Sequence, residues 1–294
     1  MKLDRSLHKR LSDLERGQSA SAVTEGKSSA TAPPVASQNQ TVAPVRAASP
    51  IQGVGEAENL HGPLETLVSG AAQAAEEGEY WELVTPIAAY GEWAERAVQH
   101  WLEATASGHF PGELLPGGNL SPQGTVFFDT ETTGLSNEPL FLVGMLCHDG
   151  GGAHIRQLLA RDYSEEPAVL AQSRRLLAQA EAIVSYNGIT FDVPYLRNRL
   201  RYHRLGKLEL PAHLDLLPVA RRKLGRSLGN CRLQTLEHHL CRRDRCNDIG
   251  GAQIPQAYHD FVADGDAGAL RRIIEHNSFD VITLAEIAAH LSLA

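Results

Sequence analysis

The chain has little with which to cross a membrane or to form a disulfide scaffold. Its 294 residues contain no run of about 18 apolar residues, the length that a membrane-spanning helix needs. The N-terminus has no apolar stretch followed by a small-residue cleavage site, as a secretory signal has. Four cysteines are too few for a disulfide-rich fold of this length. The sequence therefore predicts a cytoplasmic protein without a membrane span.

Two further absences concern nucleotides and aromatic side chains. Neither of the common glycine-rich phosphate loops, G-x-G-x-x-G or G-x-x-x-x-G-K-[ST], is present, which leaves dinucleotide-binding and P-loop folds without support. The first aromatic residue is Tyr80, and residues 18–55 are mainly small or polar. Such composition predicts a disordered linker over 18–62. Leucines spaced four and three apart predict a short amphipathic helix before it, over 1–17.

Charge is unevenly distributed along the chain. The net charge is −8, and residues 63–121 alone carry one basic and nine acidic residues. Residues 197–245, in contrast, hold 13 Lys and Arg against 4 Asp and Glu. This basic stretch either follows a phosphate backbone or forms an ordinary solvated face. All three tryptophans fall within 63–107, which we interpret as helical, so we predict an acidic helical segment over 63–119.

The remainder of the chain has α/β character. Apolar and alternating runs predict strands at 125–128, 140–147, 155–159 and 183–186, and helical periodicity predicts helices at 166–179, 193–203 and 270–290. Strands followed by alternating helices and strands indicate a mixed central sheet flanked by helices, in a domain over 120–294.

Paired carboxylates end the first of these strands. Asp129 and Glu131 lie two residues apart, so their side chains project from one face of the strand. Carboxylates held this close repel each other unless a cation neutralises them, and oxygen ligands suit Mg²⁺ or Mn²⁺. Gly134 then allows the chain to turn closely past a bound group. An acidic turn without a ligand is the alternative interpretation.

Two later motifs carry the remaining candidate residues. Asn187-Gly188 makes a turn after a buried strand, and Asp192 begins the next helix, either as a cap or as a further metal ligand. His276 and Asp280 lie one helical turn apart on the last helix. Histidine near its ordinary pKa is able to accept a proton from water, although such pairs are also common on helix surfaces.

In this order the three motifs resemble those of the DEDD exonuclease superfamily, whose fold is ribonuclease H-like. More narrowly, the chain resembles the YprB-type ribonuclease H-like family over about residues 124–292. Segments between the motifs add to the likeness: 141–144, 214–216, 233–237 and 248–251. The four-residue spacing of His276 and Asp280 is that of the tyrosine class of these enzymes rather than the histidine class.

The resemblance implies a 3′–5′ exonuclease that acts on the 3′ end of DNA or RNA with two divalent cations. The implied metal ligands are Asp129, Glu131, Asp192 and Asp280. His276 is implied to orient or deprotonate the attacking water. The residues implied to lie near the substrate are Thr132, Thr133, Gly134, Leu135 and Asn187.

Three alternatives remain. A nucleic-acid-binding or scaffold module would keep the fold without turnover, and an endonuclease of the same fold would cut internally. Zinc is a further option, through Cys231, Cys241 and Cys246 with His238 and His239. Their C-x9-C-x4-C spacing has no C-x2-C pair and is poor for a structural zinc site.

Overall fold

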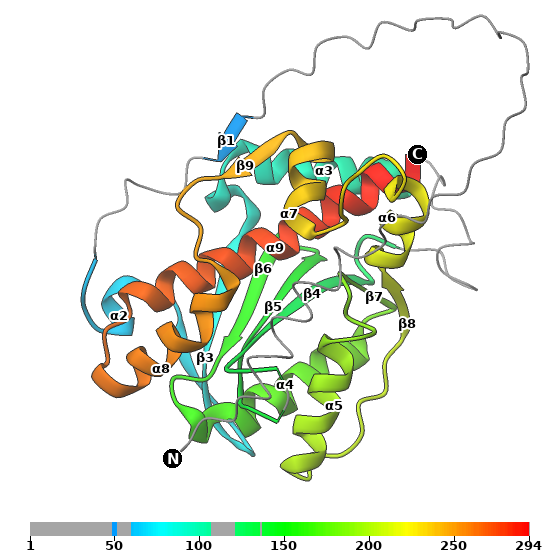
Figure 1. Ribbon diagram of the computed structural model, residues 1–294. Helices are drawn as coiled ribbons and strands as arrows, with labels where there is room; N and C mark the ends of the chain where they lie inside the picture. Colours follow the sequence, from blue (N-terminus) through cyan, green and yellow to red (C-terminus); the bar gives the residue numbers. More distant parts are fainter. Residues whose placement is uncertain (1–48, 52–59, 107–120, 136, 294) are drawn as a thin grey trace, which may run out of the picture. The chain divides into compact units, whose positions relative to one another are not determined.

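A seven-stranded mixed sheet forms the centre of the protein in the computed structural model (Figure 1). The structure describes residues 49–51, 60–106, 121–135 and 137–293. The predicted helix over 1–17, most of the predicted linker and residues 107–119 of the acidic segment lie outside this part of the chain. Among the described residues, no helix is long and apolar enough to cross a membrane.

The strands are β1 (Ser49–Ile51), β2 (Ala71–Ala75), β3 (Gly78–Pro86), β4 (Thr125–Thr132), β5 (Leu140–Asp149), β6 (Gly152–Leu159), β7 (Ala182–Ser185), β8 (Ala212–Asp215) and β9 (Arg243–Arg245). The α-helices are α2 (Leu64–Leu67), α3 (Glu92–Ala106), α4 (Glu166–Gln179), α5 (Asp192–Tyr202), α6 (Leu216–Leu224), α7 (Leu233–Leu236), α8 (Ile254–Asp264) and α9 (Gly268–Leu293). Short 3-10 turns form at Ile87–Tyr90, Tyr163–Glu165 and Gly251–Gln253, and a π-helical turn at Glu237–Cys241.

The sheet order is β2-β3-β6-β5-β4-β7-β8. Strands β2 to β6 pair antiparallel, whereas β7 lies parallel to both β4 and β8. The mixed sheet predicted from the sequence is therefore confirmed, as are the predicted strands and helices between residues 125 and 290. The prediction assigned no elements to β8, α6, α7, β9 and α8, of which β8, α7 and β9 are only three or four residues long.

Two predictions for the N-terminal half are wrong. Residues 71–86 form the β2–β3 hairpin instead of a helix, and β3 pairs with β6 at the edge of the same sheet. Alanine and glutamate favour helix, but this preference amounts to little free energy per residue. Pairing with a sheet edge overrides it. Residues 49–51, placed in the predicted linker, form β1, which pairs with β9.

Helices cover both faces of the sheet. Neighbouring side chains on a strand point to opposite faces, so Phe127 and Phe128 of β4 enter different cores. The Phe128 core includes residues of α4, α5 and α8, and the Phe127 core includes residues of α3, α6 and the C-terminal half of α9. Helix α9 crosses the sheet and contacts both β4 and β5 (Figure 1). This crossing brings the last helix to the acidic end of β4.

A buried ion pair between Glu166 and Arg199 joins α4 to α5. Arg199 Nε lies 2.6 Å from Glu166 Oε1, and both side chains are almost fully buried. The same carboxylate accepts a hydrogen bond from the backbone N–H of Leu140 at 2.9 Å and contacts His203 Nε2 at 2.8 Å. Glu166 therefore links the start of β5 to two helices.

Removal of this carboxylate should strongly destabilise the fold. Glu166→Ala leaves the Arg199 guanidinium buried without its partner, and breaking such a pair costs about 3–5 kcal/mol. Urea unfolding of the variant should show that loss in the free energy of unfolding. The exposed pair of Glu92 and Arg96 provides the control, because Glu92→Ala should change stability by less than about 1 kcal/mol. Equal effects of the two substitutions would contradict this assignment.

Candidate active site

The carboxylates of β4 lie at the middle of the sheet, where the strand is flanked by β5 and β7. Asp129 pairs in register with Gly144, and Glu131 pairs with Leu142, so the two carboxylates share one face. The β4–β5 register shifts between Glu131 and Thr132, where regular pairing ends. The predicted placement of Asp129 and Glu131 at the end of an apolar strand is confirmed.

Helix α9 brings two further candidate residues to this strand end. Donor atoms of Glu131, His276 and Asp280 all lie within 4.8 Å of one another. His276 Nε2 is 3.4 Å from Asp280 Oδ2, as expected for residues one helical turn apart. Although 145 residues and several elements separate β4 from these positions, the fold gathers the three side chains.

Asp192 approaches from the start of α5. Its side chain is buried, and its Oδ1 accepts a hydrogen bond from Thr130 Oγ1 on β4. Asp129 and Asp192 do not belong to the group of three residues whose ligand atoms lie within 4.8 Å of one another. Their negative charges nevertheless interact with the carboxylates of that group. All four predicted carboxylates and His276 thus lie close enough to the end of β4 for their charges to interact.

Burial, with repulsion between neighbouring charges, raises the pKa values of Asp129, Glu131 and Asp192. Burial raises the pKa of Glu131 to about 8; the charge of His276 opposes this rise, and the charges of Asp280 and Asp192 add to it. Burial also raises the pKa of Asp192 to about 6. The pKa of Asp129 lies well above its ordinary value because of burial and of the neighbouring charges on Asp280, Glu131 and Asp192.

This donor set fits a hard divalent cation. Carboxylate oxygens are the ligands that Mg²⁺ and Mn²⁺ prefer, and a nearby cation would favour the ionised forms that repulsion now disfavours. Asp129, Glu131, Asp192 and Asp280 would supply the carboxylate oxygens for such ions. The predicted ligand set is therefore compatible with the structure, and its metal identity stays a prediction.

Two residues beside the site were missed from the sequence. Arg245 of β9 lies 2.6 Å from Asp280 Oδ1, and Asp248 Oδ1 lies 2.8 Å from His276 Nδ1. Burial lowers the pKa of His276, but its hydrogen bond to Asp248 and the charges of Asp280 and Glu131 prevail and raise it to about 9. Without a metal, the imidazole is therefore protonated at neutral pH.

Asn277 is the third residue whose role the sequence did not indicate. Its Nδ2 donates a hydrogen bond to Asp129 Oδ2 at 3.0 Å, and its Oδ1 accepts one from Gln157 Nε2, also at 3.0 Å. A Cβ atom on Gly144 would lie 1.9 Å from Asn277 Oδ1. Gly144 therefore allows the amide to reach the carboxylate from α9. The only sequence signal for Asn277 was its place directly after His276, within the motif that ends at Asp280.

The residues expected near a substrate form the loops around the site. Thr132 Oγ1 donates to the Gly134 carbonyl at 2.8 Å, and Thr133 donates from its backbone N–H to the Pro139 carbonyl at 2.9 Å. Leu135, at the tip of this loop, is 58% exposed, so it is free to contact a ligand. These positions stay predictions as substrate contacts.

Asn187 shapes the turn between β7 and α5. Its backbone has a φ of 64°, and its N–H donates to Asp215 Oδ1 at 2.8 Å. Asp215 also accepts from the backbone N–H groups of Ile189 and Leu217. The side chain of Asp215 thus fixes this turn and the start of α6, a structural role that places Asp192.

The weakly supported zinc set does not assemble among the described residues. Cys241 instead lies near Glu286 and His290, with no second cysteine in that group. Burial keeps the pKa of the Cys241 thiol well above its ordinary value. All four cysteines are free thiols.

Comparisons with known proteins define the family. A profile of the RNase H superfamily matches residues 126–292, more than half of the chain. The chain belongs to this superfamily, and its sheet and helices form the ribonuclease H-like fold.

One relative is the uncharacterized protein YprB of Bacillus subtilis (strain 168). It is 33% identical over 171 residues, which cover 56% of this chain and 41% of YprB. The chain thus matches less than half the length of that relative. The family B DNA polymerase of the hyperthermophilic archaeon Pyrobaculum calidifontis shares 16% identity at a TM-score of 0.46, over 59% of this chain and 25% of the polymerase.

Gly144→Ala should disrupt the contact between α9 and β4. The added methyl group would displace Asn277 and leave Asp129 without its hydrogen bond, at a cost of roughly 1–3 kcal/mol for overpacking. Thermal unfolding and Mn²⁺ titration should show lower stability and weaker metal binding. Gly251→Ala is the control, because no atom lies within 4 Å of its added Cβ. Unchanged metal binding in Gly144→Ala would contradict the proposed contact.

The metal-free protein should lose stability as pH rises from about 5 to 9. In the folded state Glu131 has its pKa raised to about 8 and His276 to about 9, so the native state holds more protons than the unfolded chain in this range. Melting temperatures in EDTA should fall with pH, and the fall should be shallower in Glu131→Gln. Identical pH profiles for the two proteins would contradict the raised pKa of Glu131.

Proposed function

We propose that the protein is a metal-dependent nuclease that removes nucleotides from the 3′ end of a nucleic acid. The observation that carries this proposal is that Asp129, Glu131, Asp192 and Asp280, from β4, α5 and α9, lie close enough for their charges to interact, with Glu131 and Asp280 in one cluster with His276. A purely structural module gains nothing from buried carboxylates that repel one another. Membership of the RNase H superfamily supports a nuclease-type fold.

Two divalent cations, Mg²⁺ or Mn²⁺, would supply Lewis acidity and a nucleophilic water at these carboxylates. The chain's own residues set where that happens. Thr130 holds Asp192 and Asn277 holds Asp129, so two carboxylates are oriented by hydrogen bonds before any ligand arrives. Such pre-orientation reduces the reorganisation needed during reaction.

His276 is the candidate for proton transfer. Asp248 orients its ring through Nδ1, which leaves Nε2 facing Asp280 and Glu131. Nearby cations would lower the pKa of this imidazole from about 9 and make the neutral form accessible. In that form His276 is placed to orient the attacking water or to accept its proton.

In this proposal the loop from Thr132 to Leu135 receives the terminal nucleotide. It follows Glu131 directly, and Tyr195 of α5 fixes it by donating a hydrogen bond to the Gly134 carbonyl at 3.0 Å. The turn at Asn187 lies next to the same region, because it leads into α5, whose first residue is Asp192. The exposed Leu135 offers an apolar surface to a base.

The test is hydrolysis of 5′-labelled single-stranded DNA and RNA with Mn²⁺, with Mg²⁺ and with EDTA. We expect a ladder that shortens from the 3′ end, requires metal and disappears in Asp129→Ala, with activity reduced by at least about 100-fold. Asp260→Ala, which removes an exposed carboxylate on α8, should keep full activity.

The other outcomes identify the alternatives. Cleavage of a closed circular substrate would replace the exonuclease by an endonuclease. Nucleic-acid binding without hydrolysis under any metal, by protein that binds Mn²⁺ and is folded, would refute the nuclease and favour a binding module.

A further inference from the structure

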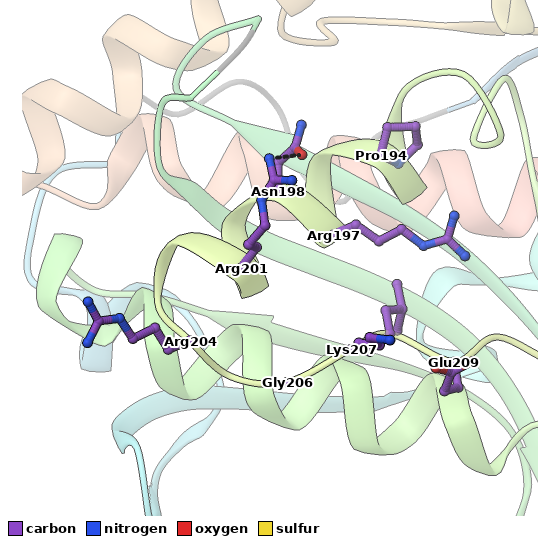
Figure 2. A pocket seen from close by; sticks show the side chains of 9 residues that line it. Pro194, Arg197, Asn198, Arg201, Arg204, Gly206, Lys207 and Glu209 are labelled. Carbon is purple, nitrogen blue, oxygen red and sulfur yellow. Dashed lines mark hydrogen bonds between the residues drawn. The ribbon is translucent and has the colours of Figure 1, made fainter.

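Basic side chains surround a pocket next to α5. It has a volume of about 870 Å³ and is formed by residues of α5, from Pro194 to Arg201, and by the loop that follows the helix. Figure 2 shows its charged lining residues, Arg197, Arg201, Arg204, Lys207 and Glu209. Four cations and a single carboxylate give this α5 pocket a positive charge.

The cations of the α5 pocket have no acidic partners among the described residues. Arg201 contacts only the Asn198 amide, at 3.3 Å, and all four cations are exposed. Arg197 and Arg201 lie one turn apart on the same face of α5, where like charges weaken a helix. Arg199, between them, points inward and pairs with Glu166. The helix therefore separates a structural arginine from arginines that are free to bind an anion.

The α5 pocket continues toward the candidate active site. A second cavity, of about 170 Å³, shares Pro194 and Asn198 with it and is also lined by Leu135 and Thr190. Asp192, at the start of α5, stands nine residues before Arg201, or about 14 Å along the helix at 1.5 Å per residue. The second cavity thus joins the α5 pocket to Leu135, in the loop that follows β4, and to Thr190, in the turn that precedes α5.

We propose that the α5 pocket holds the sugar-phosphate backbone of a single nucleic-acid strand whose end lies at the carboxylates, a role that rests on the proposed function. Stacked nucleotides place a phosphate about every 3.4 Å, so 14 Å corresponds to roughly four nucleotides. Contacts between cations and phosphates position a strand without reading its bases. The pocket therefore fits a strand of any sequence.

The other cations of the basic stretch 197–245 do not line the α5 pocket. Arg243 and Arg245 are buried in ion pairs with Glu237, Glu286 and Asp280. The exposed Arg221, Arg222 and Arg226 lie on or just after α6, whose apolar residues pack in the other core, and none of them lines the α5 pocket. They provide a control of equal charge from the same stretch of sequence.

The test compares two triple variants in which arginines are replaced by glutamine. R197Q/R201Q/R204Q removes cations of the α5 pocket, and R221Q/R222Q/R226Q removes the same charge elsewhere. Binding of fluorescein-labelled oligothymidylate and oligouridylate is measured by anisotropy in EDTA across a range of salt concentrations. The two probes distinguish DNA from RNA, and melting temperatures verify folding.

We expect the α5 variant to bind more weakly, with the slope of log affinity against log salt smaller by roughly 2, since each single-strand phosphate contact contributes about 0.7. The α6 variant should keep a slope near that of the unmodified protein. R197K/R201K/R204K, which retains the charges, should restore binding. Equal losses in the two glutamine variants, or no loss in the α5 variant, would overturn the proposal.

Hydrolysis of bis(p-nitrophenyl) phosphate separates this proposal from the nuclease itself. That small ester reaches the carboxylates without reaching the α5 pocket, so the α5 variant should hydrolyse it at the unmodified rate while degrading oligonucleotides more slowly. If the unmodified protein hydrolyses neither substrate, the proposed function fails, and the binding comparison in EDTA still decides whether the pocket holds a strand.

Discussion

Repulsion among carboxylates held at the end of β4 is the constraint around which the site is organised. Glu131 and Asp192 are buried, and their pKa values are raised to about 8 and about 6. Charges in such surroundings are costly unless they are paired or neutralised. The structure meets this cost with hydrogen bonds and cations supplied by elements distant in the sequence.

The compensating contacts also fix where α9 crosses the sheet. Asn277 bonds to Asp129, and the close approach that this bond needs is possible because position 144 on β5 is glycine. Arg245 of β9 reaches Asp280, while Asp248 holds the His276 ring. A helix that crossed elsewhere would lose all of these contacts together. The candidate chemistry and the packing of the last helix thus depend on the same few side chains.

Helix α5 serves both proposed parts of the function. Its first residue, Asp192, faces the carboxylates, and its exposed face carries Arg197 and Arg201 toward the α5 pocket. On its inward side, Arg199 anchors the helix through Glu166. Rigid anchoring of this helix would keep a bound strand in a constant relation to the carboxylates, as a site built on regular elements allows.

The sequence by itself determined what depends on local spacing. Apolar and alternating runs predicted β4 to β7, and the two-residue spacing of Asp129 and Glu131 placed both on one face, because side-chain direction along a strand alternates. Tertiary structure decided what depends on distant partners. Residues 71–86 became strands because the edge of β6 offered pairing, against their helical composition. Arg243 and Arg245 became buried partners of carboxylates, while Arg197 and Arg201 remained at the surface, although all four belong to one basic stretch. Charge can be counted along a chain, but its pairing is set only when the fold brings opposite charges together.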